Sequence, residues 1–342
     1  MKKKLLDILK VILFLGIGVF LIWYFYNKLT SDDKSRIIES FTNANYYIIL
    51  LSVAVALLSH IIRTLRWQML LKASGNNPGF MNTFLSLMIG YFANLALPRL
   101  GEVSRCGLLN KYEKVPFTVS FGTVISERAL DLVTFIVLFF VNFLIQYDTL
   151  KEYVSANFYA PLAQKFEWIG KGYILWAAML LIVVLFTLTI IYHKKLLRFR
   201  PYGVIIGIVK GFWIGLKSIS KIKKPVLFII YTLGIWVCYF LMTWIVFFSL
   251  TEMAGFGPVP AFSVLVIGTI GIMLLPGGVG IYPILVKETL GLYGAASATS
   301  YALGWLLWGT QTISIIIAGI IALILLPIIN SVKNGTASNN SK

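Results

Sequence analysis

The chain has 342 residues, of which 58% are hydrophobic and only 13% are charged, and its mean hydropathy is +0.85. A soluble domain carries roughly 25% charged residues, so this composition excludes a water-soluble fold. The formal net charge of +17 does not indicate nucleic-acid binding, because the basic residues lie in short loops between apolar segments, where the positive-inside rule accounts for them.

Six apolar segments are long enough to cross about 30 Å of hydrocarbon as helices. Lipid offers no hydrogen-bond partner to a free backbone group, so these segments are predicted to be α-helical. The first segment follows three lysines, as a secretory signal does, but it continues into aromatic residues without a cleavage pattern and is interpreted as a span. In chain order the predicted spans are 8–26, 46–64, 118–145, 173–192, 226–250 and 300–327.

Two further apolar segments end in residues that stop a helix. Residues 80–97 lead into the sequence PRLGE (98–102), and residues 261–275 lead into PGGVG (276–280). Proline and clustered glycine break helices, so each segment is predicted to be a broken or re-entrant element. The predicted fold is an all-α integral membrane protein, a polytopic bundle of about six spans and two broken elements.

The charge distribution predicts the topology. If both broken elements are re-entrant, 22 of the 30 lysines and arginines lie on the cytoplasmic side, and the two faces carry net charges of +19 and −1. This bias favours both termini in the cytoplasm and a location in the cytoplasmic membrane.

The order of elements repeats, and corresponding landmarks lie about 180 positions apart. Three crossings in each half invert the second half, which predicts an inverted repeat with halves 1–148 and 173–330 inside one domain, 1–330. The alternative is chance spacing in a generic bundle. Between the halves, 200–224 is predicted to be an amphipathic helix on the cytoplasmic interface or an ordinary helix packed on the bundle. The polar tail 331–342 is predicted to be disordered.

Charged residues fall inside a predicted span. The apolar run after Asp131 is too short to cross, so Glu127, Arg128 and Asp131 must lie within the membrane. Each such charge costs at least about 2.5 kcal/mol, and such groups face a bundle interior or a wet cavity. Two interpretations remain open at this point, a self-neutralising packing triad and a substrate or proton pathway.

A second cluster, Arg99, Glu102 and Arg105, follows the first broken element. A guanidinium presents a planar donor fork that suits phosphate, so these residues are candidates for binding a lipid headgroup. The alternative is simple positive-inside anchoring. Only a short loop separates this cluster from Glu127, which favours a functional role.

The second broken element has its own candidate residues. Its turn contains Pro276, Gly277, Gly278 and Gly280, which allow a hinge or a close approach to phosphate. Lys287 and Glu288 follow within the predicted membrane region. Because neighbours in sequence do not face each other on a helix, their partners are expected in the first-half cluster.

The sequence contains no motif of covalent catalysis, no Walker-type phosphate loop and no His or Cys arrangement typical of a metal site. No catalytic residue, cofactor or metal is therefore predicted, and the chain is interpreted as a non-enzyme. An intramembrane lipid-modifying enzyme is kept as a minor alternative.

At these residues the chain resembles the transmembrane, flippase-like domain of lysylphosphatidylglycerol synthases. The matching pieces are PRLGEVSR (98–105), ERALD (127–131) and PGGVG (276–280), and the resemblance covers nearly the whole chain. It implies movement of a lipid between leaflets, with the charged residues of the first two pieces lining the headgroup path. Relatives often carry an acidic residue where this chain has Pro283, so that role is vacant or taken by Glu288. The synthetase domain is absent, which argues against lysyl transfer.

The leading hypothesis is a flippase for a phospholipid or a related anionic or aminoacylated lipid, with membrane lipids as its partners. The alternative is a non-catalytic accessory subunit or scaffold for a separate lipid-modifying enzyme, in which the buried charges serve packing.

Overall fold

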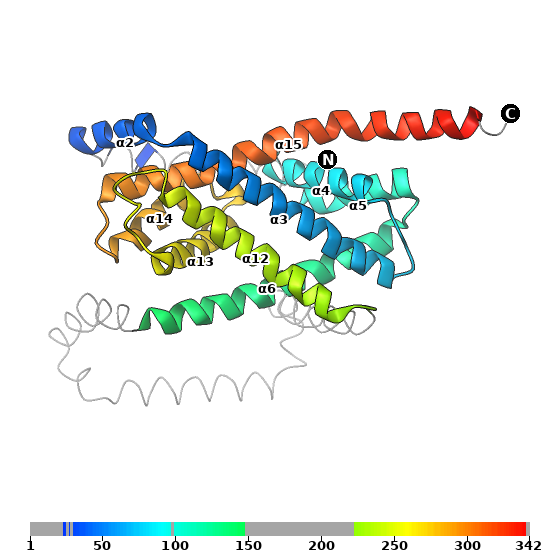
Figure 1. Ribbon diagram of the computed structural model, residues 1–342, viewed down its shortest axis with the longest axis horizontal. Coiled ribbons are helices and arrows are strands. Elements are labelled where there is room, and N and C mark those ends of the chain that lie inside the picture. The colour runs from blue at the N-terminus through cyan, green and yellow to red at the C-terminus, as the bar shows by residue number, and fades with distance from the viewer. Residues whose placement is uncertain (1–22, 25–26, 28–29, 97–98, 148–221, 340–342) are drawn as a thin grey trace, which may run out of the picture.

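The computed structural model describes residues 23–24, 27, 30–96, 99–147 and 222–339. This part of the chain is helical and contains no strand (Figure 1). The helices of the first half are α2 (Ser31–Asn43), α3 (Tyr46–Ala73), α4 (Phe80–Ala96), α5 (Leu100–Glu113) and α6 (Phe117–Ile145). Those of the second half are α12 (Pro225–Phe247), α13 (Pro258–Leu274), the short 3₁₀ turn η3 (Pro276–Gly278), α14 (Ile281–Gly291) and α15 (Ser297–Asn339).

Four of the described helices are long and apolar enough to cross a membrane: α3, α6, α12 and the Ser297–Ser331 part of α15. They correspond to four of the six predicted spans. The other two predicted spans, 8–26 and 173–192, lie outside the described residues, as does nearly all of the predicted connector 200–224. The polytopic helical fold predicted from the sequence is therefore confirmed.

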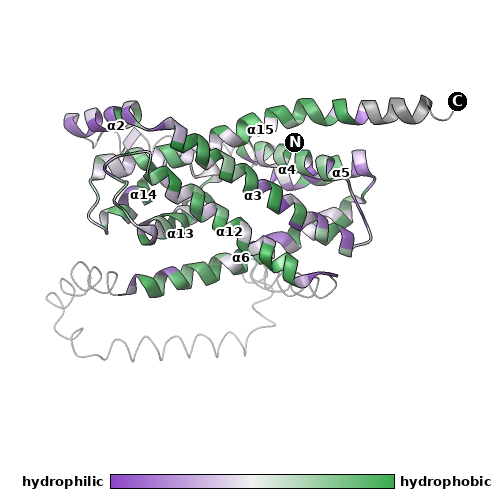
Figure 2. Cartoon of the chain, in the orientation of Figure 1, coloured by the Kyte–Doolittle hydropathy of each residue, from purple (hydrophilic) through white to green (hydrophobic). Residues whose placement is uncertain are grey.

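The outer surface of the bundle is apolar. Long stretches of α12 and α15 are green, and hence hydrophobic, in Figure 2, and many large apolar side chains on these helices are exposed. On α15, the exposed side chains Ile313, Ile317, Ile320 and Ile324 follow helical spacing and form one stripe. An apolar surface of this extent is unsuited to water and indicates a lipid-facing surface.

Both broken elements fold into helical hairpins. The helix α4 ends at Ala96 and α5 packs back against it, while α13 ends at Leu274 and α14 packs back on α13. Glycines allow the close approach in each hairpin. A Cβ on Gly101 would lie 2.0 Å from the backbone oxygen of Gly90, and one on Gly268 would lie 2.6 Å from the ring of Tyr282. Each predicted broken element is therefore a helical hairpin, in which the second helix packs back along the first.

The contacts between the halves are reciprocal. The hairpin helix α4 packs on α15, the last helix of the second half, and α13 packs on α6, the last helix of the first half. The helices α3 and α12 run antiparallel, because Asn45 at the start of α3 donates a backbone hydrogen bond to Ser249 just after α12 (2.8 Å). Reciprocal packing and opposite direction are the arrangement that an inverted repeat requires.

Three segments are helical where the sequence analysis predicted no helix. The polar helix α2 begins with a capping box in which Thr30 and Asp33 exchange hydrogen bonds. The helix α5 was interpreted as a loop, although it begins directly after the break at Pro98-Arg99. The final helix α15 continues to Asn339, into the tail that was predicted to be disordered.

Candidate functional site

A network of buried charges joins three helices of the first half. Glu127 and Asp131 lie one turn apart on α6, and Arg63 of α3 bridges them. Its Nη1 lies 2.7 Å from Glu127 Oε1 and 2.6 Å from Asp131 Oδ2. The other terminal nitrogen of Arg63 donates to the hydroxyl of Tyr239 on α12 (2.9 Å). The network therefore reaches from the first half of the chain to the second.

Two further arginines complete this charge network, which we define as Arg63, Arg66, Arg105, Glu127 and Asp131. Arg66 Nη2 lies 2.7 Å from Asp131 Oδ1, and Arg105 Nη1 lies 3.2 Å from Glu127 Oε2. The side chains of Arg66 and Glu127 are fully buried, and that of Asp131 is 14% exposed. Charge-assisted hydrogen bonds of this length are the strong kind, and burial protects them from screening.

The first hairpin positions Arg105. Asn94 on α4 accepts a hydrogen bond from the backbone N–H of Gly101 (2.7 Å), which satisfies one of the free donors in the first turn of α5. One turn further along α5, the guanidinium of Arg105 lies 4.6 Å from the centre of the Trp67 ring. That ring is itself held by a hydrogen bond from its Nε1 to Thr123 (3.0 Å). Packing and a cation–π contact thus hold Arg105 against Glu127.

The sequence analysis missed Arg63 and Arg66. It ended the span at residue 64 and counted these arginines, together with Arg105, on the cytoplasmic side. In the structure α3 continues to Ala73, and all three arginines are buried in the network. The sequence did contain a signal for these partners. Arg63 and Arg66 are three residues apart and share one face of α3, and Glu127 and Asp131 are four apart and share one face of α6.

The structure brings the two first-half clusters, which the sequence analysis separated by only a short loop, into contact. Arg105 reaches Glu127, and Arg128 Nη2 lies 3.1 Å from Glu102 Oε1. The self-neutralising triad is wrong, because the partners of Glu127 and Asp131 come from α3 and α5. The Arg128–Glu102 pair is the outermost link, with side chains 43% and 20% exposed.

Arg99 lies at the tip of the first hairpin, before the first turn of α5, and is exposed. Its backbone is left-handed, with φ 69° and ψ −2°. Gly277, at the tip of the second hairpin, has φ 70° and ψ 1°. The two residues follow Pro98 and Pro276, so corresponding positions of the halves share one backbone conformation.

The second-half turn lies beside the first hairpin. Gly277, Gly278 and Gly280 all have positive φ, which explains the clustered glycines after Pro276. A Cβ on Gly277 would lie 4.0 Å from the side chain of Leu95 near the end of α4. The backbone oxygen of Gly277 accepts a hydrogen bond from Trp308 Nε1 (2.6 Å). The turn of the second hairpin therefore lies close to the end of α4 in the first hairpin.

Lys287 and Glu288 form an ion pair with each other, which the sequence analysis did not expect. Lys287 Nζ lies 3.2 Å from Glu288 Oε1, so these neighbours on α14 pair with each other. The side chain of Glu288 is 63% exposed. Long side chains allow adjacent residues to meet even though their Cβ atoms diverge.

The charge network holds more positive than negative charge. Within the described part of the chain, three guanidiniums face two carboxylates, and Arg105 Nη2, Arg63 Nε and Arg66 Nε have no hydrogen-bond partner. Buried donors without an acceptor are rare and costly. Among the described residues no group of three metal-binding side chains occurs. The chemistry that this arrangement favours is the binding of an anion.

The comparisons with known proteins agree with this picture of a membrane bundle. The chain is similar to a UPF0104 membrane protein of Methanocaldococcus jannaschii, with 36% identity over 115 residues, which are 33% of this chain and 34% of the relative. It is also similar to a UPF0104 membrane protein of Methanothermobacter thermautotrophicus, with 27% identity over 179 residues, 51% of this chain and 48% of the relative. The chain thus covers less than half the length of each relative. No solved structure matches.

The family comparison covers almost the whole chain. Residues 8–319 match the family described as the lysylphosphatidylglycerol synthase TM region. This match includes the two hairpins, the charge network, three of the four described spans and the first part of the fourth, Ser297–Ser331. The chain is an integral membrane protein that belongs to the lysylphosphatidylglycerol synthase TM region family.

Proposed function

We propose that this protein moves a phospholipid, or a related anionic or aminoacylated lipid, between the leaflets of the cytoplasmic membrane, with both termini in the cytoplasm. The observation that carries the proposal is the unpartnered Nη2 of Arg105 in a buried network with excess positive charge. A packing network reaches its lowest energy when its charges are matched and its donors are paired. A phosphate would supply both the missing charge and the missing acceptors.

The position of the charge network suits a headgroup. It lies on helices that cross the membrane, next to the hairpin α4–α5 and in contact with the second half through Tyr239. A polar headgroup that passes between leaflets needs such a site, because hydrocarbon offers it no hydrogen bonds. In this structure the charge network is closed, and the Arg128–Glu102 pair joins α5 to α6 at its exposed edge. We infer that this pair separates to admit the headgroup.

The test is lipid movement in liposomes that contain the purified protein and a leaflet-specific lipid reporter. Arg105→Lys keeps the charge but removes the planar fork with its unpaired nitrogen, so we expect lipid movement to fall about tenfold or more. Arg36→Lys is the matched control, because Arg36 lies on the exposed helix α2 and pairs only locally with Asp32 (2.9 Å).

Wild-type protein that moves lipid no faster than empty vesicles would end the proposal. The accessory or scaffold alternative predicts that substitutions in the charge network lower expression and thermal stability without a separate loss of activity. An Arg105→Lys protein that is as stable as wild type but inactive would count against that alternative.

A further inference from the structure

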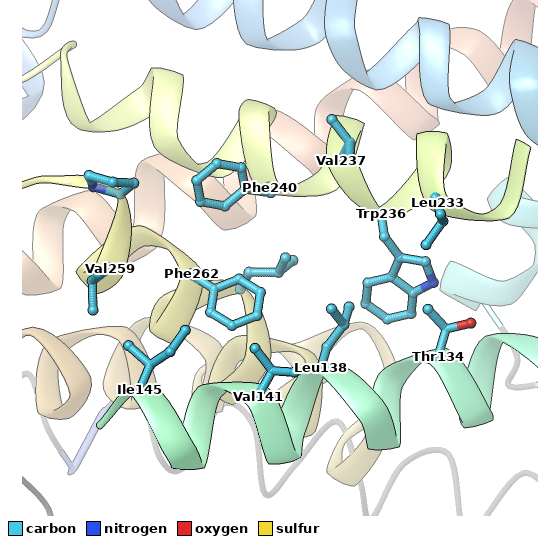
Figure 3. A pocket seen from close by; sticks show the side chains of 12 residues that line it. Thr134, Leu138, Val141, Ile145, Leu233, Trp236, Val237, Phe240, Val259 and Phe262 are labelled. Atoms are coloured by element: carbon cyan, nitrogen blue, oxygen red, sulfur yellow. The ribbon is translucent and has the colours of Figure 1, made fainter. Parts of the chain in front are cut away.

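A groove lies between α6, α12 and α13 and has a volume of about 400 Å³ (Figure 3). Among the described residues of its lining, the polar side-chain groups are the hydroxyl of Thr134 and the indole N–H of Trp236. Leu233 and Val237 at its rim are more than half exposed, so the groove opens on the surface formed by the described residues. The lining residues are Thr134, Leu138, Val141, Ile145, Leu233, Trp236, Val237, Phe240, Pro258, Val259, Phe262 and Leu265.

One face of α6 joins the charge network to this groove. Glu127 and Asp131 belong to the network, and Thr134, Leu138 and Ile145 continue at helical spacing along the same face. Thr134 is three residues, or about 4.5 Å along the helix axis, beyond Asp131. The face therefore changes from charged to apolar within one turn, which is the pattern of a phospholipid that lies along the helix.

Trp236 lies at the end of the groove nearest the charge network. Figure 3 shows its indole beside Thr134 and Leu233. Its ring meets that of Tyr239 edge-on at 5.8 Å, and Tyr239 accepts the hydrogen bond from Arg63. The residue is 92% buried, and its Nε1–H has no hydrogen-bond partner in the structure. Because this donor is buried, an ester oxygen of a lipid at this end of the groove would reach it only after a rotation of the indole.

The length and volume of the groove suit an acyl chain better than a helix. From Thr134 to Ile145 the groove is about 16 Å long, close to half of the 30 Å hydrocarbon core and hence to one leaflet's acyl chains. A helix of that length and about 10 Å across would fill roughly 1,300 Å³, which exceeds even the total empty space of about 880 Å³ in and around the groove. A single slender chain fits, whereas an inserted helix does not.

We propose that the groove between α6, α12 and α13 holds one acyl chain of the lipid, with its glycerol ester end at Thr134 and Trp236 and its methyl end at Ile145 and Val259. This inference rests on the proposed function, because the anionic headgroup of the same lipid would then lie beside the charge network. The excess positive charge of the network complements that headgroup. The lipid would lie with its tail directed away from the network.

The test uses a phosphatidylglycerol that carries a photoreactive diazirine in its acyl chain, in liposomes with the full-length protein. After illumination, labelled peptides are mapped by mass spectrometry. A diazirine near the glycerol should label Thr134 and Leu233, and one near the methyl end should label Ile145 and Val259. A reversed order, or label confined to the exposed residues Val137 and Phe140 outside the groove, overturns the proposal.

The same liposomes separate this inference from the proposed function. Label in the groove without lipid movement supports an acyl-chain site and contradicts the flippase. Lipid movement with an unlabelled groove supports the flippase and contradicts the site.

A pair of substitutions on α6 gives an independent readout. Val141→Trp fills the groove, and Val137→Trp adds the same bulk one turn earlier, at an exposed residue outside the groove lining. Val141→Trp should reduce groove labelling about tenfold or more, as expected when a well-filled site is overpacked, while Val137→Trp leaves it unchanged. Equal labelling of the two variants overturns the proposal.

Discussion

The two hairpins have similar backbones but different chemistry. Each turns after a proline, and Arg99 and Gly277 have almost the same dihedral angles at the two tips. The first hairpin contributes Arg105 to the charge network and Glu102 to its outer ion pair. The second contributes glycines and an apolar contact between Gly268 and Tyr282. The two hairpins therefore share a backbone conformation at their tips, whereas only the first contributes a residue to the charge network.

The two hairpin tips differ in which residue occupies the left-handed position, Arg99 in the first and Gly277 in the second. A left-handed conformation suits glycine but costs a residue with a Cβ roughly 1–2 kcal/mol. The second half places glycine there, and the first half places arginine in spite of the cost. Strain of this kind is often retained at functional positions, which agrees with a role for Arg99 in contacting a headgroup.

The largest expected effect comes from removing the central carboxylate of the charge network. Glu127→Gln leaves Arg105 without its charge partner and Arg63 with Asp131 alone, so we expect a loss of about 3–5 kcal/mol in stability, as for other broken buried pairs. Thermal unfolding in detergent measures the loss. The control, Glu288→Gln on the second hairpin, removes an exposed charge and should change stability by less than about 1 kcal/mol. If the two variants have the same melting temperature, the charge network does not stabilise the first half of the protein more than the exposed pair stabilises the second.

A smaller effect is expected where the helices of the first hairpin cross. Gly101→Ala places a methyl group against the backbone of Gly90, so overpacking should cost about 1–3 kcal/mol or more. Gly107→Ala on the same helix is the control, because no neighbouring atom lies within 4 Å of the added Cβ. That variant should be neutral or slightly stabilised by the helix propensity of alanine. Equal thermal stability of the two variants would contradict the close contact between Gly101 and Gly90.

The exchange of residues at the tips tests their comparison directly. Gly277→Ala has room for its methyl group but not a favourable φ, so it should lose roughly 1–2 kcal/mol of stability. Arg99→Gly should gain about 1 kcal/mol by the same argument, while lipid movement falls. A more stable Arg99→Gly protein with unchanged lipid movement would remove Arg99 from the site.

The smallest effect concerns α2, outside the four described spans. Hydrogen bonds from the side chain and then the backbone of Thr30 lower the pKa of Asp33 below its ordinary value. A lowered pKa means that the ionised carboxylate stabilises the helix. This contribution is present at neutral pH and is lost as the pH falls below about 4, near the ordinary pKa of aspartate. Hydrogen exchange of α2 amides should therefore speed up at acid pH in wild type, relative to the intrinsic rate, and change little in Asp33→Asn.

The sequence predicted four of the described spans and both helix breaks, because length, hydropathy and proline-glycine patterns are local properties. It also predicted that Glu127 and Asp131 lie inside the membrane, since the run after Asp131 is too short to cross. It did not predict the continuation of α3 past residue 64. Arginines at a span end normally indicate the edge of the membrane, and only partners on other helices show that Arg63 and Arg66 are buried.

The sequence by itself determined that this chain is a membrane bundle, that two of its helices are broken, and which family it resembles. The tertiary structure decided which charges meet. It placed Arg63, Arg66 and Arg105 against two carboxylates of α6, paired Arg128 with Glu102, and brought Lys287 and Glu288 into contact. The physical reason is that hydropathy and helix-breaking residues are local properties of the sequence. An ion pair instead requires two side chains that only the packing of helices brings within a few ångströms of each other.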